Sequence, residues 1–162
     1  MKDLDIVAFQ PRNWFGRLIA WLTNSPYSHI GIVLNGEQEM MVEARLTVRV
    51  TNLRPDKRSH VLYTLKTPLT AAQITAAKTY LSSMLGAGYD FPNLLDIFIN
   101  MFRRALNRTY RSYWQRDGRP VCSELVARAY GAAGVILCHG KPLWAITPGD
   151  IISSGYFREV TK

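Results

Sequence analysis

The sequence predicts an α+β fold, in which an antiparallel sheet packs against helices. Apolar and β-branched runs typical of strands occur at residues 4–9, 28–34, 39–44, 46–50 and 60–65. Asn35-Gly36 separates two of these runs, and such a pair between apolar runs indicates a β-hairpin. Helical spacing of apolar residues then dominates the second half of the chain, so strands and helices are largely grouped apart.

The remaining elements follow in order. Apolar residues at helical spacing predict a helix over residues 14–22, which Asn24-Ser25-Pro26 ends. Further helices are expected around residues 74–84, with Thr70 as N-cap, and over residues 94–106 and 122–133, the last followed by Gly134. Residues 147–150 read Thr-Pro-Gly-Asp, which predicts a turn, and a short last strand is expected near Val160.

Length and composition are those of one globular domain spanning residues 1–162. The chain has 162 residues, of which 48% are apolar and 20% charged. No run approaches the roughly 18 apolar residues that a membrane span needs. The polar start of the chain also lacks the apolar segment of a secretory signal. We therefore expect a cytoplasmic protein, unless another route takes it to the cell envelope.

The charge balance is basic, with 20 Lys and Arg against 12 Asp and Glu and a net charge of +8. Such a balance attracts polyanions such as nucleic acid, anionic lipid or an anionic cell wall, without choosing among them. The sequence contains no phosphate-binding loop, no HExxH motif and no GxSxG motif. Two cysteines are too few for a structural zinc site, so no metal, other cofactor or disulfide is expected.

Cys122 is the first candidate for chemistry, because it opens an amphipathic helix. The N-terminus of a helix carries partial positive charge and free N–H groups, which stabilise a thiolate and can hold an oxyanion. Leu125 and Val126 follow three and four residues later, so the sulfur is expected to point inward, toward the sheet. An inert buried cysteine is the alternative interpretation. Cys138, which begins no helix, is interpreted as structural.

His29 is the second candidate. On a strand, His29, Gly31 and Val33 share the face opposite the apolar residues 30, 32 and 34. Gly31 leaves room for another element to approach closely, and we expect the helix that carries the thiol to fill that room. A structural histidine, exposed or hydrogen-bonded, is the alternative.

Glu43 is the candidate for the group that orients the imidazole. It lies among apolar residues on the hairpin partner of the His29 strand, and an acid in such a strand needs a partner. That partner is either His29 or a neighbouring cation such as Arg45 or a lysine.

Several segments, taken in order along the chain, resemble the circularly permuted branch of the NlpC/P60 superfamily. They read YSHIGIV at residues 27–33, VEA at 42–44, GYD at 88–90 and VCSELV at 121–126, with DIV at 5–7 and PGDI at 148–151 as further blocks. The branch includes the YiiX/YebB-like bacterial proteins and is distantly similar to lecithin retinol acyltransferase. Leu4 stands where the family usually has a glycine before the first aspartate.

The resemblance implies a papain-like fold in permuted order, with the histidine strand before the cysteine helix. It places the nucleophile at Cys122, the general base at His29 and the orienting polar residue at Glu43. Tyr27 and Tyr89 would line the substrate site. The implied reaction is attack of the Cys122 thiolate on an acyl carbonyl, which gives a thioester that water or another acceptor resolves.

The resemblance favours a cysteine hydrolase of peptidase or amidase type, of bacterial or phage origin, that cuts an amide bond in peptidoglycan peptides. A lipid acyl hydrolase or acyltransferase is the alternative, and a non-catalytic polyanion-binding module is another. Between Arg103 and Arg119, arginines alternate with aromatic residues, which suits an anionic polymer or a membrane surface, or simply a solvated basic face. No specific nucleic acid is expected as a partner.

Overall fold

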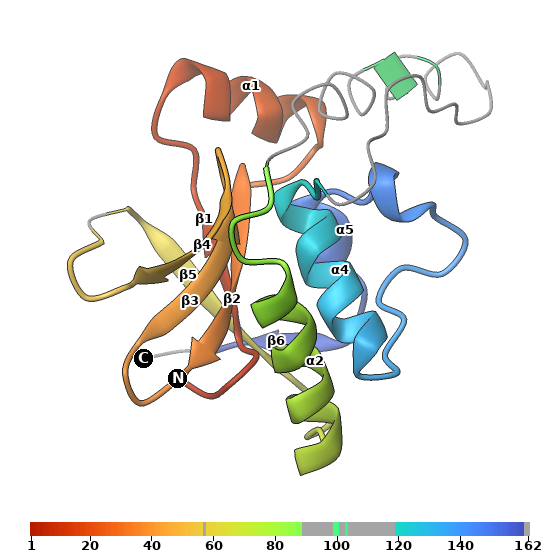
Figure 1. Ribbon diagram of the computed structural model, residues 1–162. Helices are drawn as coiled ribbons and strands as arrows, with labels where there is room; N and C mark the ends of the chain where they lie inside the picture. The colour runs from red at the N-terminus through yellow and green to blue at the C-terminus, as the bar shows by residue number, and fades with distance from the viewer. Residues whose placement is uncertain (57, 89–98, 101–102, 104–118, 161–162) are drawn as a thin grey trace.

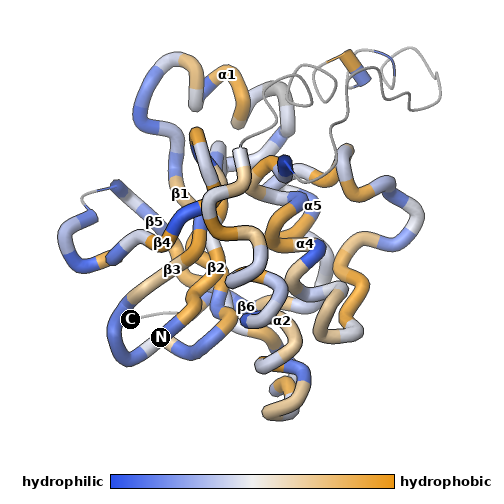
Figure 2. The backbone as a smooth tube through the Cα atoms, viewed as in Figure 1, coloured by the Kyte–Doolittle hydropathy of each residue, from blue (hydrophilic) through white to orange (hydrophobic). Residues whose placement is uncertain are grey.

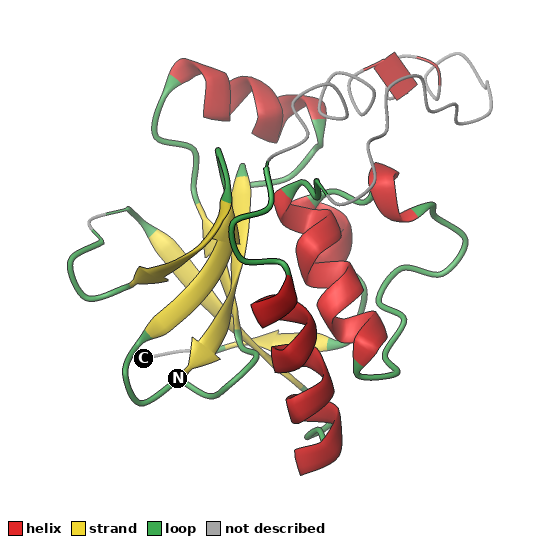
Figure 3. Cartoon of the chain, in the orientation of Figure 1, coloured by secondary structure: helices red, strands yellow, loops and turns green. Residues whose placement is uncertain are grey.

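The computed structural model describes residues 1–56, 58–88, 99–100, 103 and 119–160. In this part of the chain, an antiparallel sheet lies on one side and the longer helices pack against one of its faces (Figure 1 and Figure 3). The predicted α+β class is thereby confirmed.

The described strands form a six-stranded sheet in the order β4-β3-β2-β1-β5-β6, with every neighbouring pair antiparallel. Their bounds are Ile6–Phe9 (β1), His29–Asn35 (β2), Met40–Ala44 (β3), Val48–Asn52 (β4), His60–Leu65 (β5) and Phe157–Glu159 (β6). The strand predictions are confirmed to within two residues at each end. β4 starts two residues later than expected, because residues 45–47 form the turn that connects it to β3.

The helices are α1 (Trp14–Leu22), α2 (Ala71–Ser83), α4 (Cys122–Ala132) and α5 (Pro148–Ile152), with a 3₁₀ turn, η1, at Leu143–Ala145. Thr70 is the N-cap of α2 as predicted, and it exchanges hydrogen bonds with Gln73 in a capping box. Gly134 follows α4 with a φ of 77°, a conformation that favours glycine. The helix expected over residues 94–106 lies mostly outside the described residues.

The turn predicted at residues 147–150 is wrong, because this segment begins α5. Thr147 is the N-cap, Pro148 occupies the first helical position, and Asp150 accepts hydrogen bonds from the backbone and side chain of Thr147. Thr-Pro-Gly-Asp thus serves as a capping box with proline where its missing N–H costs nothing. The β2–β3 hairpin is as predicted, but Asn35 shapes it through its side chain, which accepts from the N–H groups of Glu37 and Gln38.

The main core lies between the sheet and α2, α4 and α5. It contains Ile6, Ile30, Ile32 and Val42 from the sheet, together with Leu81, Leu125, Tyr130 and Ile151 from the helices. A smaller apolar cluster covers the opposite face and includes Val7, Phe9, Val33, Met41 and Leu53. Because Leu53 follows β4 directly, the connection from β4 to β5 helps to close this second face. Among the described residues, no helix is long and apolar enough to cross a bilayer.

Leu4 explains why a glycine suits the position before the first aspartate. Its φ is 66°, in the left-handed region that costs a residue with a side chain about 1–2 kcal/mol. The conformation persists because the Leu4 side chain is 2% exposed, its N–H donates to the Val33 carbonyl, and its own carbonyl accepts from the Tyr130 hydroxyl. Burial therefore offsets a backbone that glycine would adopt without strain.

The strain at Leu4 predicts an unusual order of stability. Leu4→Ala and Leu4→Gly both lose the buried side chain, but only glycine relieves the left-handed backbone. We expect the free energy of unfolding of Leu4→Gly to exceed that of Leu4→Ala by about 1 kcal/mol, measured by urea denaturation. Ala8, in an extended strand, is the control, since Ala8→Gly should destabilise the protein. An alanine variant at position 4 as stable as the glycine variant would refute the strain.

Candidate active site

His29 is the first residue of β2 and lies at the end of the sheet where β1 finishes. Its side chain is largely buried, and its Nε2 lies 3.0 Å from Oε2 of Glu43. Phe9 pairs with it across the strands, and the centres of the two rings are 5.6 Å apart. The imidazole is therefore held between an apolar ring and a carboxylate, with Nε2 engaged and Nδ1 left for another partner.

Glu43 is fully buried on β3, on the same face of the sheet as His29. The pairing of Ile32 with Val42, continued by one residue, places Glu43 opposite Gly31 and two residues from His29. A side chain at Gly31 would meet the Met41 sulfur at 2.9 Å and the Glu43 Cβ at 3.6 Å. The glycine therefore leaves the space across which the carboxylate reaches the imidazole.

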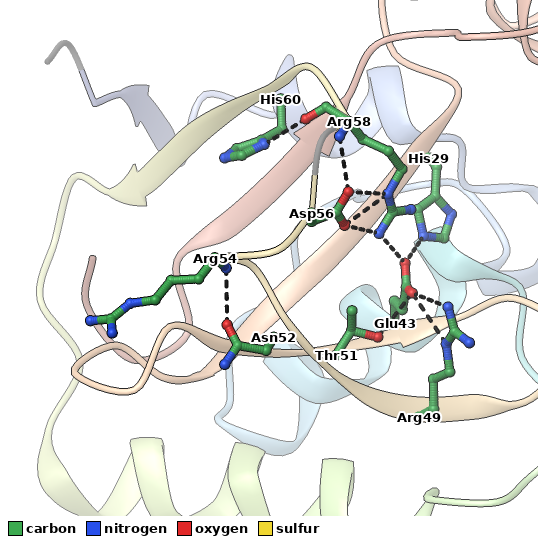
Figure 4. A network of polar contacts seen from close by, with 9 residues as sticks. All are labelled: His29, Glu43, Arg49, Thr51, Asn52, Arg54, Asp56, Arg58 and His60. Carbon is green, nitrogen blue, oxygen red and sulfur yellow. Dashed lines mark hydrogen bonds and ion pairs between the residues drawn. The ribbon is translucent and has the colours of Figure 1, made fainter.

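Each oxygen of Glu43 has several donors (Figure 4). Oε2 accepts from His29 and, at 3.0 Å, from the Arg58 guanidinium. Oε1 accepts from the Arg49 guanidinium at 2.9 Å and from the Thr51 hydroxyl at 3.0 Å. All the donors come from neighbouring strands or from the β4–β5 connection, so the carboxylate joins three strands and a loop.

Arg58 is itself held in place from two sides. Its guanidinium binds Asp56, two residues before it in the chain, and lies 3.8 Å from the centre of the Phe9 ring. Stacking of a guanidinium on an aromatic ring is favourable and fixes its plane. Phe9 thus supports both the cation and the imidazole that share Oε2 of Glu43.

The surroundings of Glu43 keep it ionised. Burial raises its pKa, but the hydrogen bond and charge of His29, together with Arg49 and Arg58, outweigh burial and hold the pKa well below its usual range. The group is thus a carboxylate at any pH near neutrality, able only to accept hydrogen bonds. A permanent acceptor at Nε2 fixes the imidazole tautomer and its orientation.

Cys122 is the first residue of α4, and its side chain is 6% exposed. Val121, the N-cap, offers no side-chain acceptor to the first-turn N–H groups. Burial raises the pKa of the thiol, but the charge of His29 and the backbone N–H groups of Ile30 and Ser123 lower it below its ordinary value. The start of α4 thus stabilises a thiolate, as expected of a helix N-terminus.

The Cys122 thiol and the His29 imidazole favour each other's charged form, thiolate and imidazolium. Burial lowers the pKa of His29, but the Cys122 thiolate and then Glu43 outweigh this and raise it to about 9. Since the thiol pKa is lowered and the imidazole pKa is raised, the proton resides on His29 rather than on Cys122 between these two values. The thiolate–imidazolium form is lost when the pH rises through about 9, or falls below the pKa of the thiol.

The second cysteine has the opposite environment. Burial and the nearby Asp150 raise the pKa of Cys138 to about 11, against a smaller effect of Lys141. Its thiol is therefore protonated near neutral pH, which agrees with the structural interpretation of this residue.

The expectation that the thiol helix fills the room beside Gly31 is wrong. α4 packs on the opposite face, where Cys122 and Leu125 join the core cluster that contains Ile30 and Ile32. The Cys122 sulfur interacts with His29 at the start of β2 and with the backbone N–H of Ile30. The space beside Gly31 is occupied by side chains of β3 instead.

Tyr27, which was predicted to line the substrate site, lies elsewhere. The Tyr27 hydroxyl is 2.6 Å from that of Tyr63, and both rings line a separate pocket that also includes Pro26 and Gly149. Tyr89 and most of the region from Arg103 to Arg119 lie outside the described residues. The structure therefore brings together His29, Glu43 and Cys122, but it does not place Tyr27 in the cleft beside His29.

A cleft of about 1020 Å³ opens in front of His29. Its walls come from the end of β1, from α1, from the β3–β4 turn and from the β4–β5 connection. Its described lining includes one acid, Asp56, and four arginines: Arg12, Arg45, Arg49 and Arg58. The cleft is therefore positively charged and suits a substrate that carries a negative group.

The arginine partners of Glu43 were not foreseen from the sequence. The sequence suggested either His29 or a cation such as Arg45 or a lysine as the partner of Glu43. In the structure, Glu43 contacts His29 and two other arginines together. Arg49 lies directly opposite Glu43 in the sheet, so the register of β4 would have identified it. Arg58 comes from a loop, and no periodic signal marks such a contact.

Comparison with known proteins supports the fold. No family model matches the chain, and no curated protein is significantly similar to it in sequence. Among solved structures, the metalloprotein yiiX of Escherichia coli O157:H7 is similar with a TM-score of 0.75 and 21% sequence identity. The match covers 99% of this chain and 97% of that protein. At this identity the likeness shows a shared fold.

Within the described residues, no group of three or more His, Cys, Asp or Glu side chains is placed to hold a metal ion. Glu43 instead accepts hydrogen bonds from His29, Arg49 and Arg58, so both of its oxygens are engaged by protein groups.

The coupled pair predicts how the pKa of His29 responds to single changes. It should lie near 9 in the wild type and fall in Cys122→Ala, because the thiolate is the largest of the influences that raise it. Glu43→Gln should lower it as well. The measurement is an NMR titration of the His29 ring, with Cys138→Ala as the matched control, which should leave the value unchanged. A His29 pKa that is the same with and without Cys122 would exclude the ion pair.

Proposed function

We propose that the protein is a cysteine-dependent hydrolase of papain-like fold, in the circularly permuted order of the NlpC/P60 superfamily. The observation that carries this proposal is the arrangement of three groups in series. The buried Glu43 carboxylate orients His29, and His29 in turn shares a proton with Cys122 at the start of a helix. The likeness in fold to yiiX, a YiiX/YebB-like protein, supports the superfamily assignment.

The proposed reaction begins with the thiolate of Cys122. It attacks the acyl carbonyl of the substrate, and the carbonyl electrons move to the oxygen, which the first-turn N–H groups of α4 stabilise. The imidazolium of His29 then gives its proton to the leaving amine or alcohol as the tetrahedral intermediate collapses to a thioester. Glu43 acts through His29, by holding Nε2, and is a positioning residue.

The second half of the reaction uses His29 as a base. The neutral imidazole takes a proton from water as the water attacks the thioester carbonyl. Collapse of this intermediate breaks the carbon–sulfur bond, releases a carboxylic acid and restores the thiolate–imidazolium pair. Another acceptor in place of water would make the same site an acyltransferase.

An amide bond in peptidoglycan peptides is the substrate that the resemblance favours. The cationic cleft supports it, since such peptides carry carboxylates that Arg12, Arg45 and Arg49 can bind. An acyl ester of a lipid is the second candidate. It is supported by Phe15 and Leu46, which line the same cleft and leave apolar surface exposed at its edge.

The nucleophile and base are tested together by substitution. We expect Cys122→Ser and His29→Ala each to reduce turnover of peptidoglycan fragments or lipid esters by about 10⁴-fold or more. Binding of the substrate should survive Cys122→Ser. Cys138→Ser is the matched control and should retain activity, because that thiol is protonated and remote from His29. Mass spectrometry should find the acyl group on Cys122 alone. Turnover that persists in both variants would exclude Cys122 and His29 as nucleophile and base.

The pH dependence tests the role of Glu43. In the wild type, kcat/KM should decline as the pH rises through about 9, because His29 then loses the proton that the leaving group requires. Glu43→Gln removes a negative charge that favours the imidazolium, so its alkaline decline should move to lower pH and kcat should also fall. A lower kcat with an unmoved pH profile would show that Glu43 is merely structural.

A further inference from the structure

Helix α1 is amphipathic, but its large apolar side chains point away from the protein. Trp14 and Trp21 are 76% and 75% exposed, and Phe15 and Leu18 are exposed as well. At 100° per residue these four positions share an arc of about 120° on one side of the helix. Figure 2 shows the hydrophobic colour on this helix at the periphery of the fold, away from the core between the sheet and α4.

The inward side of α1 is made of small residues. Gly16 and Ala20 are buried, and a side chain at Gly16 would meet the Ser28 hydroxyl at 3.3 Å. A helix that stabilises a core has the reverse arrangement, with its large apolar residues inside. The outer face of α1 is therefore an exposed apolar patch, a feature typical of interaction surfaces.

This surface adjoins the cleft at His29. Phe15 and Ile19 of α1 line the cleft, and across it the β3–β4 turn presents Leu46, which is 75% exposed. The outward side chains of α1 thus continue into apolar groups at the mouth of the cleft. Whatever binds α1 also faces the opening that leads to His29.

The charges around the surface have one sign. Residues 6–36 contain no Asp or Glu, and Arg12 and Arg17 flank the tryptophans. Arg45 lies beside Leu46 on the other side of the cleft. All three arginines are exposed, and within the described part of the chain none of them takes part in an ion pair.

We propose that the outer face of α1, together with the β3–β4 turn, binds the surface of an anionic lipid bilayer and places the cleft at His29 against it. Tryptophan side chains favour the boundary between headgroups and acyl chains, and exposed arginines are attracted to anionic headgroups. A second copy of this chain fits the surface less well, because each copy would bring the same arginines and a net charge of +8. The proposal does not rest on catalysis by Cys122.

The test is sedimentation of the 162-residue chain with vesicles of phosphatidylcholine, with or without phosphatidylglycerol. The wild type should bind the mixed vesicles, and added salt should weaken that binding. Trp14→Ala combined with Trp21→Ala should weaken it on the order of tenfold or more. Because both side chains are exposed, the double variant should fold normally, which circular dichroism and thermal unfolding will show.

Two controls make the result specific. Ile136→Ala removes another exposed apolar side chain, beyond the C-terminal end of α4, and should bind as the wild type does. Cys122→Ala should also bind fully, which separates this proposal from the catalytic one. Equal binding of the tryptophan variant, equal binding to neutral vesicles, or a dimer that only the wild type forms would each overturn the proposal, the last in favour of a second copy.

Discussion

The rest of the site depends on the hydrogen bonds that the buried carboxylate of Glu43 accepts. An unpaired charge at a fully buried position would be too costly to maintain, so every part of the structure that approaches it must supply a donor. β2 supplies His29, β4 supplies Arg49 and Thr51, and the β4–β5 connection supplies Arg58. The register of the strands and the path of that loop are thereby tied to one side chain, and the position of the imidazole follows from it.

The Cys122 thiolate and Glu43 both raise the pKa of His29, but to different extents. The thiolate raises the pKa of the imidazole more than Glu43 does. Acylation of Cys122 removes the thiolate, and with it the largest reason for His29 to keep its proton. The same residue is thus an acid while sulfur is charged and a base once the thioester has formed, without any movement of the protein.

Local signals predicted the elements well, and contacts between distant residues poorly. The strands, α1, the cap of α2 and the start of α4 follow from periodicity and capping, which act over a few residues. Alternation along β2 correctly placed His29 opposite the core residues, but it does not reveal which face a distant helix covers, so α4 was assigned to the wrong side. Arg58 was beyond reach for the same reason, since its place depends on stacking against Phe9, far away in the chain.

The inverted arrangement of α1 also connects the surface to the site. Small residues on its inner side let the helix backbone lie close to Ser28, the residue directly before His29. A larger residue at Gly16 would push α1 outward and widen the cleft. The close approach of α1 to Ser28 thus positions one wall of the cleft, and it leaves no space for tryptophan side chains on the inner side of the helix. The exposure of Trp14 and Trp21 is thus a consequence of how α1 packs. It follows from a helix whose inner side is fitted to Ser28, directly before β2, and whose outer side is the membrane-binding face proposed above.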